Sequence, residues 1–242
     1  MMERIFAKVF IITILFIDRM VNFTEIFEIR KNDSRWNTSY PLSPDDWNIY
    51  RVPEELSFSE EEELSFYIHI PFCKKLCSFC EYARMLCPSV KLQDQYIDTL
   101  KHDVFTFMEK YPSIKLCGLD VGGGTPTALS DKSFENLMSL CSSAMSALTI
   151  SDSFTPSIEA TFETLTAQKV DLLTSAGFKR VSLGIQSTSS EVLSCNHRDS
   201  PDLEYMKKSI SMLPDKGVCI VNLDMMYGLK GQSIDSFRKD MQ

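Results

Sequence analysis

The sequence of 242 residues lacks any excess of positive charge. Its 25 Lys and Arg residues are outnumbered by 33 Asp and Glu residues, which gives a formal net charge of −8. A protein that binds nucleic acid usually presents a basic surface, so this balance disfavours a nucleic-acid partner. The eight cysteines are also too sparse for a secreted scaffold built on disulfides. We therefore expect reduced thiols and a cytoplasmic protein.

The chain also lacks an apolar run long enough to predict a membrane span. The run at residues 9–17 is continuous, but a transmembrane helix needs about 20 such residues. The run follows Arg4 and Lys8, as the core of an export signal would, yet residues 18–20 (Asp-Arg-Met) offer no small-residue cleavage site. A packed or disordered leader is the favoured interpretation. A membrane-associated helix and an export signal are the alternatives.

Internal repeats are absent apart from an alternation of strands and helices after residue 63. We predict two regions, a leader and pre-barrel segment over 1–63 and one β-α core over 64–242. Strands are predicted at 65–70, 115–121, 157–162, 180–185 and 219–225, and helices at 91–110, 131–147, 166–176, 203–213 and from about 234. Such alternation is typical of an α/β fold with parallel strands and right-handed crossovers. Ligands of these folds bind at the carboxyl ends of the strands.

Three cysteines follow the first predicted strand at C-x3-C-x2-C spacing. They are Cys73, Cys77 and Cys80. Three thiolates can hold a [4Fe–4S] cluster and leave one iron for a small ligand. That arrangement suits a cluster that binds S-adenosylmethionine (SAM) by its amino and carboxylate groups. The alternative is a zinc site, which takes four ligands and would need His69 or Cys87 as the fourth.

Polar motifs also follow the second and third predicted strands. Gly122–Gly124, followed by Thr125, lets the backbone approach a ligand closely and predicts exposed N–H groups. The run does not fit the P-loop pattern, and tight packing alone is the alternative. Glu159 lies in the third strand among apolar and small residues. It is a candidate ligand contact, with a structural or capping role as the alternative.

The fourth and fifth strands end near further polar residues. Gln186 could hydrogen-bond a ribose or an amino acid, and Asp224 could accept from a ribose hydroxyl. Arg198 is a candidate for the SAM carboxylate, because guanidinium binds carboxylates bidentately. The alternative for Arg198 is a surface ion pair with Asp199 or Asp202. All these motifs are predicted to meet at one rim of the sheet.

Taken in order, the motifs resemble the radical SAM enzymes related to oxygen-independent coproporphyrinogen III oxidase. The resemblance covers roughly residues 65–235 and rests on residues 67–80, 122–127, 157–160, 177–187, 196–198 and 222–229. Residues 35–41 also resemble the segment that precedes the barrel in the oxidase. The resemblance implies a partial (β/α)6 radical SAM barrel, of which about five β-α units are present and the C-terminal part is missing.

The resemblance also implies cofactors and their ligands. Cys73, Cys77 and Cys80 would hold a [4Fe–4S] cluster. Residues that would contact SAM are Tyr67, Gly123, Gly124, Thr125, Glu159, Gln186, Arg198 and Asp224. Reductive cleavage of SAM would give a 5′-deoxyadenosyl radical that acts on a porphyrin-like substrate, with electrons from a donor such as flavodoxin or ferredoxin.

The chain departs from the family pattern in four ways. Tyr82 stands where the oxidase has a further cysteine, residues 160–162 replace the usual sequence after the third strand, and Lys230 replaces a proline. Family members also continue into a sixth strand and a C-terminal domain. Two alternatives to an enzyme acting on a tetrapyrrole therefore stay open, a haem-binding or haem-delivery protein and an inactive fragment.

Overall fold

The computed structural model describes residues 58–59, 63–152, 154–199 and 201–242. The apolar run at 9–17 and the segment at 35–41 lie outside these residues. The predicted leader over 1–63 falls almost wholly outside them as well, so the division into two regions stays a prediction. Within the described ranges, no helix is both long and apolar enough to cross a membrane.

Strands and helices alternate along the described chain. The strands are β1 (Glu63–Ile70), β2 (Phe72–Cys73), β3 (Met85–Leu86), β4 (Lys115–Gly123), β5 (Thr149–Ile150), β6 (Ser157–Ala160), β7 (Arg180–Gln186) and β8 (Ile220–Met225). The helices are α3 (Val90–Lys110), the 3₁₀ turn η2 (Pro126–Ala128), α4 (Asp131–Ala147), α5 (Ala167–Ser175), α6 (Ser190–Cys195), α7 (Leu203–Asp215) and α8 (Ile234–Asp240).

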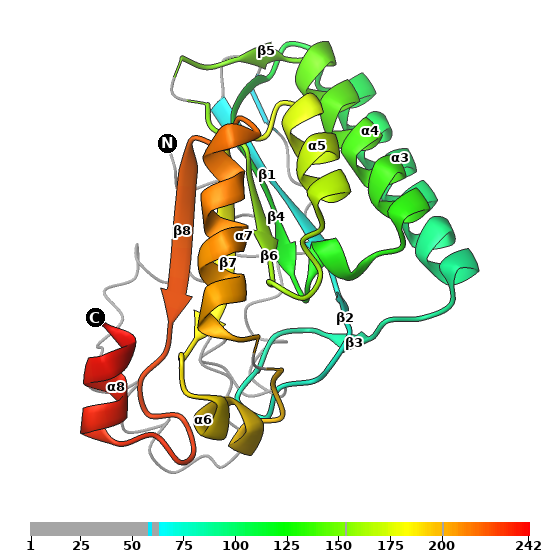
Figure 1. Cartoon of the computed structure of the whole chain (residues 1–242). Coiled ribbons are helices and arrows are strands. Elements are labelled where there is room, and N and C mark those ends of the chain that lie inside the picture. The colour runs from blue at the N-terminus through cyan, green and yellow to red at the C-terminus, as the bar shows by residue number, and fades with distance from the viewer. Residues whose placement is uncertain (1–57, 60–62, 153, 200) are drawn as a thin grey trace, which may run out of the picture.

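One parallel sheet organises the molecule. Its strands lie in the order β1-β4-β6-β7-β8, and the short β5 pairs with the start of β4. Helices α3, α4, α5 and α7 cover one side of the sheet, and the loops at the carboxyl ends of the strands gather at the opposite end from β5 (Figure 1). The predicted α/β fold with five parallel β-α units is confirmed.

Alternation along the strands gives the sheet two different faces. The side chains on the helix side are apolar and buried, as Ile68, Leu119, Ile158 and Leu183 show. The register brings polar residues and glycines together on the other face, in a row of Tyr67, Asp120, Ser157 and Arg180 and in a second row that includes Glu159, Ser182 and Asn222. The polar face is therefore the one available to a ligand.

Helix α4 shows how local sequence sets the boundaries. Ser130 caps its N-terminus by accepting a hydrogen bond from the amide of Ser133, and Asp131 places a negative charge in the first turn. Its apolar face buries Phe134 and Leu137 completely against the sheet. The result is a helix with the bounds that the apolar spacing predicts.

The structure differs from the sequence prediction mainly in short elements. The third strand ends at Ala160, because Thr161 begins a turn in which its carbonyl accepts from the amide of Thr164 at 3.2 Å. Strands β2, β3 and β5, the turn η2 and helix α6 were not predicted. Each spans too few residues to show a hydrophobic period.

Candidate functional site

The three cysteines lie on a loop that is closed at its base by two short strands. β2 pairs with β3, and further bonds join the Cys87 amide to the Cys73 carbonyl at 2.9 Å and the Met85 amide to the Pro71 carbonyl at 2.8 Å. On the far side, the Ser78 amide donates to the Asn196 carbonyl at 3.1 Å. The loop is thus held both to its own β-α unit and to the segment after α6.

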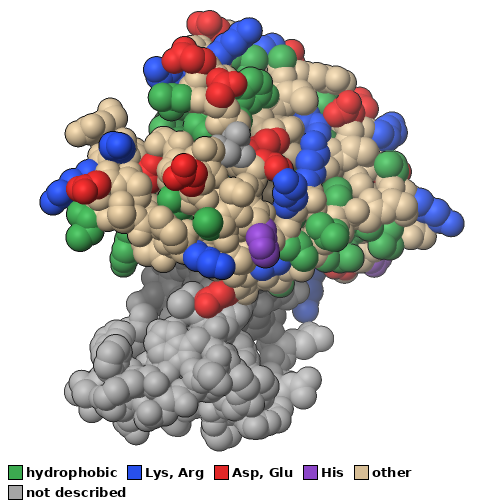
Figure 2. All heavy atoms as spheres, turned by 60° about the horizontal axis from the view of Figure 1, so that its bottom comes forward, with side chains coloured by type: hydrophobic (Ala, Val, Ile, Leu, Met, Phe, Trp, Pro, Cys, Tyr) green, Lys and Arg blue, Asp and Glu red, His purple; other side chains and the backbone are tan. Residues whose placement is uncertain are grey.

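A cavity of about 590 Å³ opens at the carboxyl ends of the strands, beside this loop. A volume of this size suits a small organic ligand. Its lining includes the three cysteines and seven of the eight predicted SAM contacts: Gly123, Gly124, Thr125, Glu159, Gln186, Arg198 and Asp224. Acidic and basic side chains are interspersed on the face that this end of the sheet presents (Figure 2). The sequence prediction that these motifs converge therefore agrees with the geometry.

Tyr67 is the exception among the predicted contacts. It does not line the cavity, and its hydroxyl lies 3.4 Å from Nδ1 of His69. His69 in turn bonds through Nε2 to the Ala83 carbonyl at 2.7 Å. In this arrangement Tyr67 and His69 support the end of the cysteine loop.

The glycine run lies directly against the cysteine loop. A Cβ at Gly124 would stand 2.9 Å from Sγ of Cys73 and 2.9 Å from the Phe72 carbonyl oxygen, too close for either atom. Gly123 has φ of 111°, a conformation that favours glycine. These two positions therefore require glycine for close approach and for backbone conformation.

The amides of this run already have hydrogen-bond partners, although the bond made by the Gly123 amide lies in an exposed position as the sequence predicts. Gly123 donates to Oε2 of Glu159 at 3.0 Å, Gly124 to the Ile70 carbonyl at 2.8 Å, and Thr125 to the Phe72 carbonyl at 2.8 Å. Residues 70–72, at the end of β1 and the start of β2, pass close enough to accept from Gly124 and Thr125, and Glu159 of β6 accepts from Gly123. A ligand at this position would therefore meet the Glu159 carboxylate together with the Gly123 amide.

Glu159 stands at the centre of the polar face. Its carboxylate reaches water in the cavity but is enclosed enough that desolvation raises its pKa, with the nearby Asp224 and Asp120 adding to the effect and the Gly123 amide opposing it. A carboxylate in this position favours a cationic ligand group, which would remove the cost of its desolvation.

Arg198 points to the cysteine loop. Its guanidinium donates to Sγ of Cys77 at 3.6 Å and to the Gly184 carbonyl. Asp199 pairs with Lys75 instead, so the surface ion pair considered for Arg198 is not the arrangement found. Asp202 caps α7 by accepting from the Tyr205 amide at 2.8 Å. Arg198 is therefore part of the cavity wall.

Gln186 and Asp224 lie at the ends of adjacent strands. Gln186 has φ of 68° and sits at a register shift between β7 and β8. This left-handed conformation accompanies the turn of the backbone out of the sheet, and the Gln186 carbonyl accepts from the Met226 amide at 3.0 Å. Asp224 accepts from Asn222 at 2.7 Å. Both residues line the cavity.

Arg84 is a site residue that the sequence interpretation missed. Its guanidinium donates to the Cys77 carbonyl at 2.9 Å and to the Cys80 carbonyl at 2.7 Å and 3.2 Å. It fixes the backbone that carries two cysteines and adds positive charge beside them. In the sequence, Arg84 could be noticed only as a charged residue four positions after Cys80. An arginine on the protein surface would look the same.

The geometry does not favour the zinc alternative. Its proposed fourth ligands point elsewhere, since His69 bonds to Ala83 and Sγ of Cys87 lies 3.4 Å from the Ala128 carbonyl. Within the described ranges, no three His, Cys, Asp or Glu side chains close on a single-ion site. Ligands of a cubane cluster bind different irons and therefore need to stand further apart.

Cys73 fits a cluster ligand that is partly shielded from water. Burial raises the pKa of its thiol and the neighbouring Cys80 and Cys77 raise it further, while the Thr125 hydroxyl, 3.8 Å from Sγ, opposes the shift. A soft iron site would displace the proton. The guanidinium groups of Arg84 and Arg198 complement the negative charge of three thiolates. The residues present therefore fit an iron–sulfur cluster.

Residues 67–242 match the family described as the Radical SAM superfamily, a span that includes the cysteine loop and the whole cavity. The chain belongs to the radical SAM superfamily. Enzymes of this superfamily use a [4Fe–4S] cluster and SAM, so the predicted cofactors are confirmed for the family.

Curated relatives of this radical SAM chain carry two kinds of name. It is 30% identical over 203 residues to the oxygen-independent coproporphyrinogen III oxidase of Salmonella typhimurium, which covers 83% of this chain and 44% of the oxidase. It is 32% identical over 184 residues to the heme chaperone HemW of Buchnera aphidicola, covering 74% of this chain and 46% of the relative. The chain thus spans less than half the length of these relatives.

A solved structure of a relative supports the same family and fold. Coproporphyrinogen III oxidase (HemN) from Escherichia coli superimposes with a TM-score of 0.68 at 30% identity, over 76% of this chain and 41% of the oxidase. The predicted partial radical SAM barrel and the resemblance to the oxidase group are thereby confirmed.

Proposed function

We propose that residues 64–242 form the cluster- and SAM-binding core of a radical SAM enzyme that acts on a porphyrin or another tetrapyrrole. The observation that carries this proposal is the convergence of the three cysteines, Glu159 and Arg198 on one cavity at the carboxyl ends of the strands. The similarity to coproporphyrinogen III oxidases supports the substrate class.

In this proposal Cys73, Cys77 and Cys80 hold the cluster. When bound, the cluster supplies a low-potential electron for reductive cleavage of the SAM sulfonium. Arg84 fixes the loop backbone through the carbonyls of Cys77 and Cys80. The electron would come from a small redox protein such as flavodoxin or ferredoxin.

The remaining cavity residues are proposed to orient SAM. Arg198 would meet the carboxylate of its methionine part, because the guanidinium already lies beside the cysteine loop. Glu159 would accept from the amino group, because its carboxylate is an anionic acceptor that lines the cavity. Gln186 and Asp224, which also line the cavity, would hydrogen-bond the ribose.

A second candidate function is haem binding or haem delivery with little SAM chemistry. Two observations favour it: the similarity to HemW, whose name describes a heme chaperone, and the presence of Tyr82 in place of the oxidase cysteine. Tyr82 is 62% exposed and lines the cavity, so its aromatic ring is accessible to a ligand there.

Anaerobic SAM cleavage tests the first proposal against the second. The chain is reconstituted with iron and sulfide, reduced and mixed with SAM, and 5′-deoxyadenosine is measured by chromatography. The matched control is Cys73→Ala. We expect product from the wild-type chain only.

The other outcomes are equally informative. A bound cluster that gives no 5′-deoxyadenosine contradicts the enzymatic proposal for this chain, and saturable haem binding under the same conditions would then favour the carrier. Equal product from wild type and Cys73→Ala would overturn the cluster assignment.

A further inference from the structure

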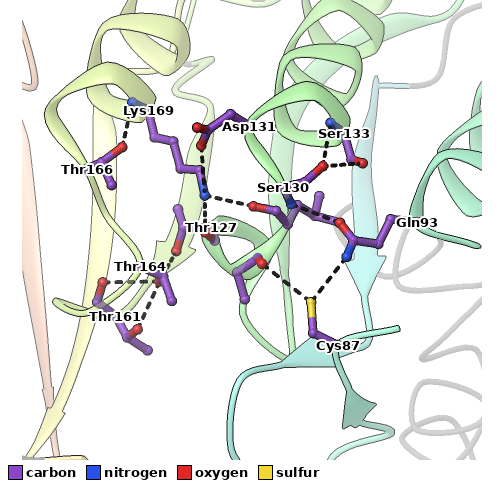
Figure 3. Close-up of polar contacts among 12 residues, drawn as sticks. Cys87, Gln93, Thr127, Ser130, Asp131, Ser133, Thr161, Thr164, Thr166 and Lys169 are labelled. Carbon is purple, nitrogen blue, oxygen red and sulfur yellow. Dashed lines mark hydrogen bonds and ion pairs between the residues drawn. The ribbon is translucent and has the colours of Figure 1, made fainter. Parts of the chain in front are cut away.

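A largely buried polar network lies next to the cysteine loop, and its members Thr161 and Thr164 also line the cavity. It joins the loop before α3, the turn η2, the start of α4 and helix α5 (Figure 3). Its central member is Lys169, a residue of α5 that is 6% exposed. A lysine is rarely buried unless its charge is paired and all its donors are used. The burial of the Lys169 charge therefore has to be explained by the partners of its ammonium group.

The ammonium of Lys169 is fully engaged with the turn η2 and its surroundings. Nζ donates to the carbonyls of Thr127 and Leu129, both at 2.7 Å, and lies 3.6 Å from Asp131 and 5.6 Å from the ring centroid of Phe134. A short 3₁₀ turn leaves carbonyls without intrahelical partners, and an ammonium with three donors satisfies several at once. Lys169 thus fixes the turn from the side of α5.

The opposite side of the same turn faces the cysteine loop. Thr125, its N-cap, donates through its amide to the Phe72 carbonyl at 2.8 Å, and its hydroxyl lies 3.8 Å from Sγ of Cys73. The Ala128 carbonyl accepts from Sγ of Cys87 at 3.4 Å. Among the described residues of this network, the turn η2 therefore lies between Lys169 on one side and Cys73 on the other.

Gln93 connects the loop before α3 to the start of α4, at the end of the network away from Lys169. This side chain of α3 is 4% exposed, donates to the Pro88 carbonyl at 2.9 Å, and accepts from the Ser130 amide at 2.8 Å. The loop between β3 and α3 is thus linked to the start of α4 through residues that do not line the cavity. A fully satisfied buried network of this kind rigidifies its surroundings.

We propose that Lys169 is a positioning residue for the iron–sulfur site, holding η2 where the Thr125 hydroxyl donates to Sγ of Cys73. This inference rests on the proposed function, in which Cys73 is a cluster ligand. Hydrogen bonds to ligand sulfurs shift the reduction potential of a cluster. Lys169 would therefore influence that potential without touching the cluster.

The first test needs no cluster. Backbone hydrogen exchange is compared in the full chain, as wild type, Lys169→Met and a matched control, Lys132→Met, which removes an exposed lysine next to the network. We expect the amides of Thr125 and Ala128 to exchange about 10- to 100-fold faster in Lys169→Met alone, because charged hydrogen bonds to the turn are lost. Amides of β7 should keep their rates, and Lys169→Arg should restore those of the turn.

The second test measures the midpoint potential of the reconstituted cluster. Thr125→Val should lower it, because a donor to the ligand sulfur is lost. Lys169→Met should lower it too, and the double variant should match Thr125→Val, since both act through one hydrogen bond. An additive double variant, or an unchanged potential in Thr125→Val, would overturn the proposal.

The two tests separate the possible failures. Equal acceleration of exchange in η2 and β7 would mean that Lys169 only stabilises the fold, which overturns the positioning role. If Lys169→Met does not fold, Lys169→Gln, which keeps two N–H donors without the charge, replaces it in both measurements, and Thr125→Val still tests the hydrogen bond to Cys73. A wild-type chain that binds no cluster would refute the proposed function, while the exchange result would still decide whether Lys169 holds the turn.

Discussion

At the scale of single residues, the chemistry of the site depends on which neighbours each side chain has. The three cysteines belong to one motif, yet their neighbours differ. Cys73 contacts Thr125, whereas Cys77 contacts Arg198. The motif was visible in the sequence because the three cysteines all lie within residues 73–80. These contacts were not, because their partners lie 52 and 121 residues away in the chain.

Cys77 offers the most direct residue-scale prediction. Cys77→Ala should abolish the brown absorbance of the reconstituted chain, because two thiolates cannot retain the cluster. Iron and sulfide content and the visible spectrum measure the effect, with the exposed Cys219→Ala as the matched control. Retention of the iron content of a full cluster in Cys77→Ala would refute the ligand assignment.

Glu159 provides a second residue-scale prediction. Glu159→Gln removes the charge proposed to accept from the SAM amino group and weakens the bond with the Gly123 amide. SAM affinity should fall about 10- to 100-fold, the value of a charge-assisted hydrogen bond. Calorimetric titration of the cluster-loaded chain measures it. Glu163→Gln, at another carboxylate of the cavity, is the control, and an equal loss there would argue against a specific role.

At the scale of elements, the long strands and helices could be predicted, and the short ones could not. Helix α4 has the bounds that its apolar spacing predicts, because nearly every buried position lies on one face. By contrast, β2 and β3 span two residues each, and their pairing closes the cysteine loop. Their existence depends on tertiary contacts, which a local hydrophobic period does not record.

Helix α8 is held to the site by one carboxylate. Asp240 accepts from the Thr188 amide at 2.6 Å, the Thr188 hydroxyl at 2.7 Å and Ser187 at 2.9 Å, directly after Gln186. Partial burial raises the pKa of Asp240, but these hydrogen bonds outweigh it and hold the pKa below its ordinary value of 3.8. The helix therefore supports the backbone at the end of β7.

This arrangement predicts a pH-dependent contribution to stability. A carboxyl whose pKa is lowered by folding stabilises the fold above its unfolded value of 3.8, and that contribution is lost as the pH falls through the lower folded pKa. Asp240→Asn should lower the free energy of unfolding at pH 7 by about 1 kcal/mol. Urea denaturation at several pH values measures it. A difference between wild type and variant that persists below the folded pKa would contradict the assignment.

At the scale of the whole molecule, the cavity belongs to no single β-α unit. The cysteine loop follows β1, Glu159 lies in β6, and Arg198 follows α6. The sequence predicted their convergence because the carboxyl ends of parallel strands meet at one edge. It did not predict that Tyr67 would lie outside the cavity, since the direction of one side chain depends on the packing of its neighbours.

Cluster binding should change the behaviour of the whole chain in limited proteolysis. Lys74 and Lys75 are exposed trypsin sites between two cysteines. Cluster binding should slow cleavage there about tenfold. A stabilisation of the closed loop by about 1.4 kcal/mol lowers the population of the open, cleavable loop by that factor. Mass spectrometry of timed digests measures it, and Cys73→Ala should show no protection after the same reconstitution. Equal rates with and without the cluster would argue against binding at this loop.

The bonds between the cysteine loop and the segment after α6 also set an order of events during synthesis. Cys77 leaves the ribosome 121 residues before Arg198, and Ser78 leaves 118 residues before Asn196. At about 5–20 residues per second, this gap lasts roughly 6 to 24 seconds. Throughout that interval the three thiols are present without the cation and the backbone acceptor that complete their surroundings. The surroundings of the three thiols are therefore complete only after residues 196–198, which follow α6, have emerged.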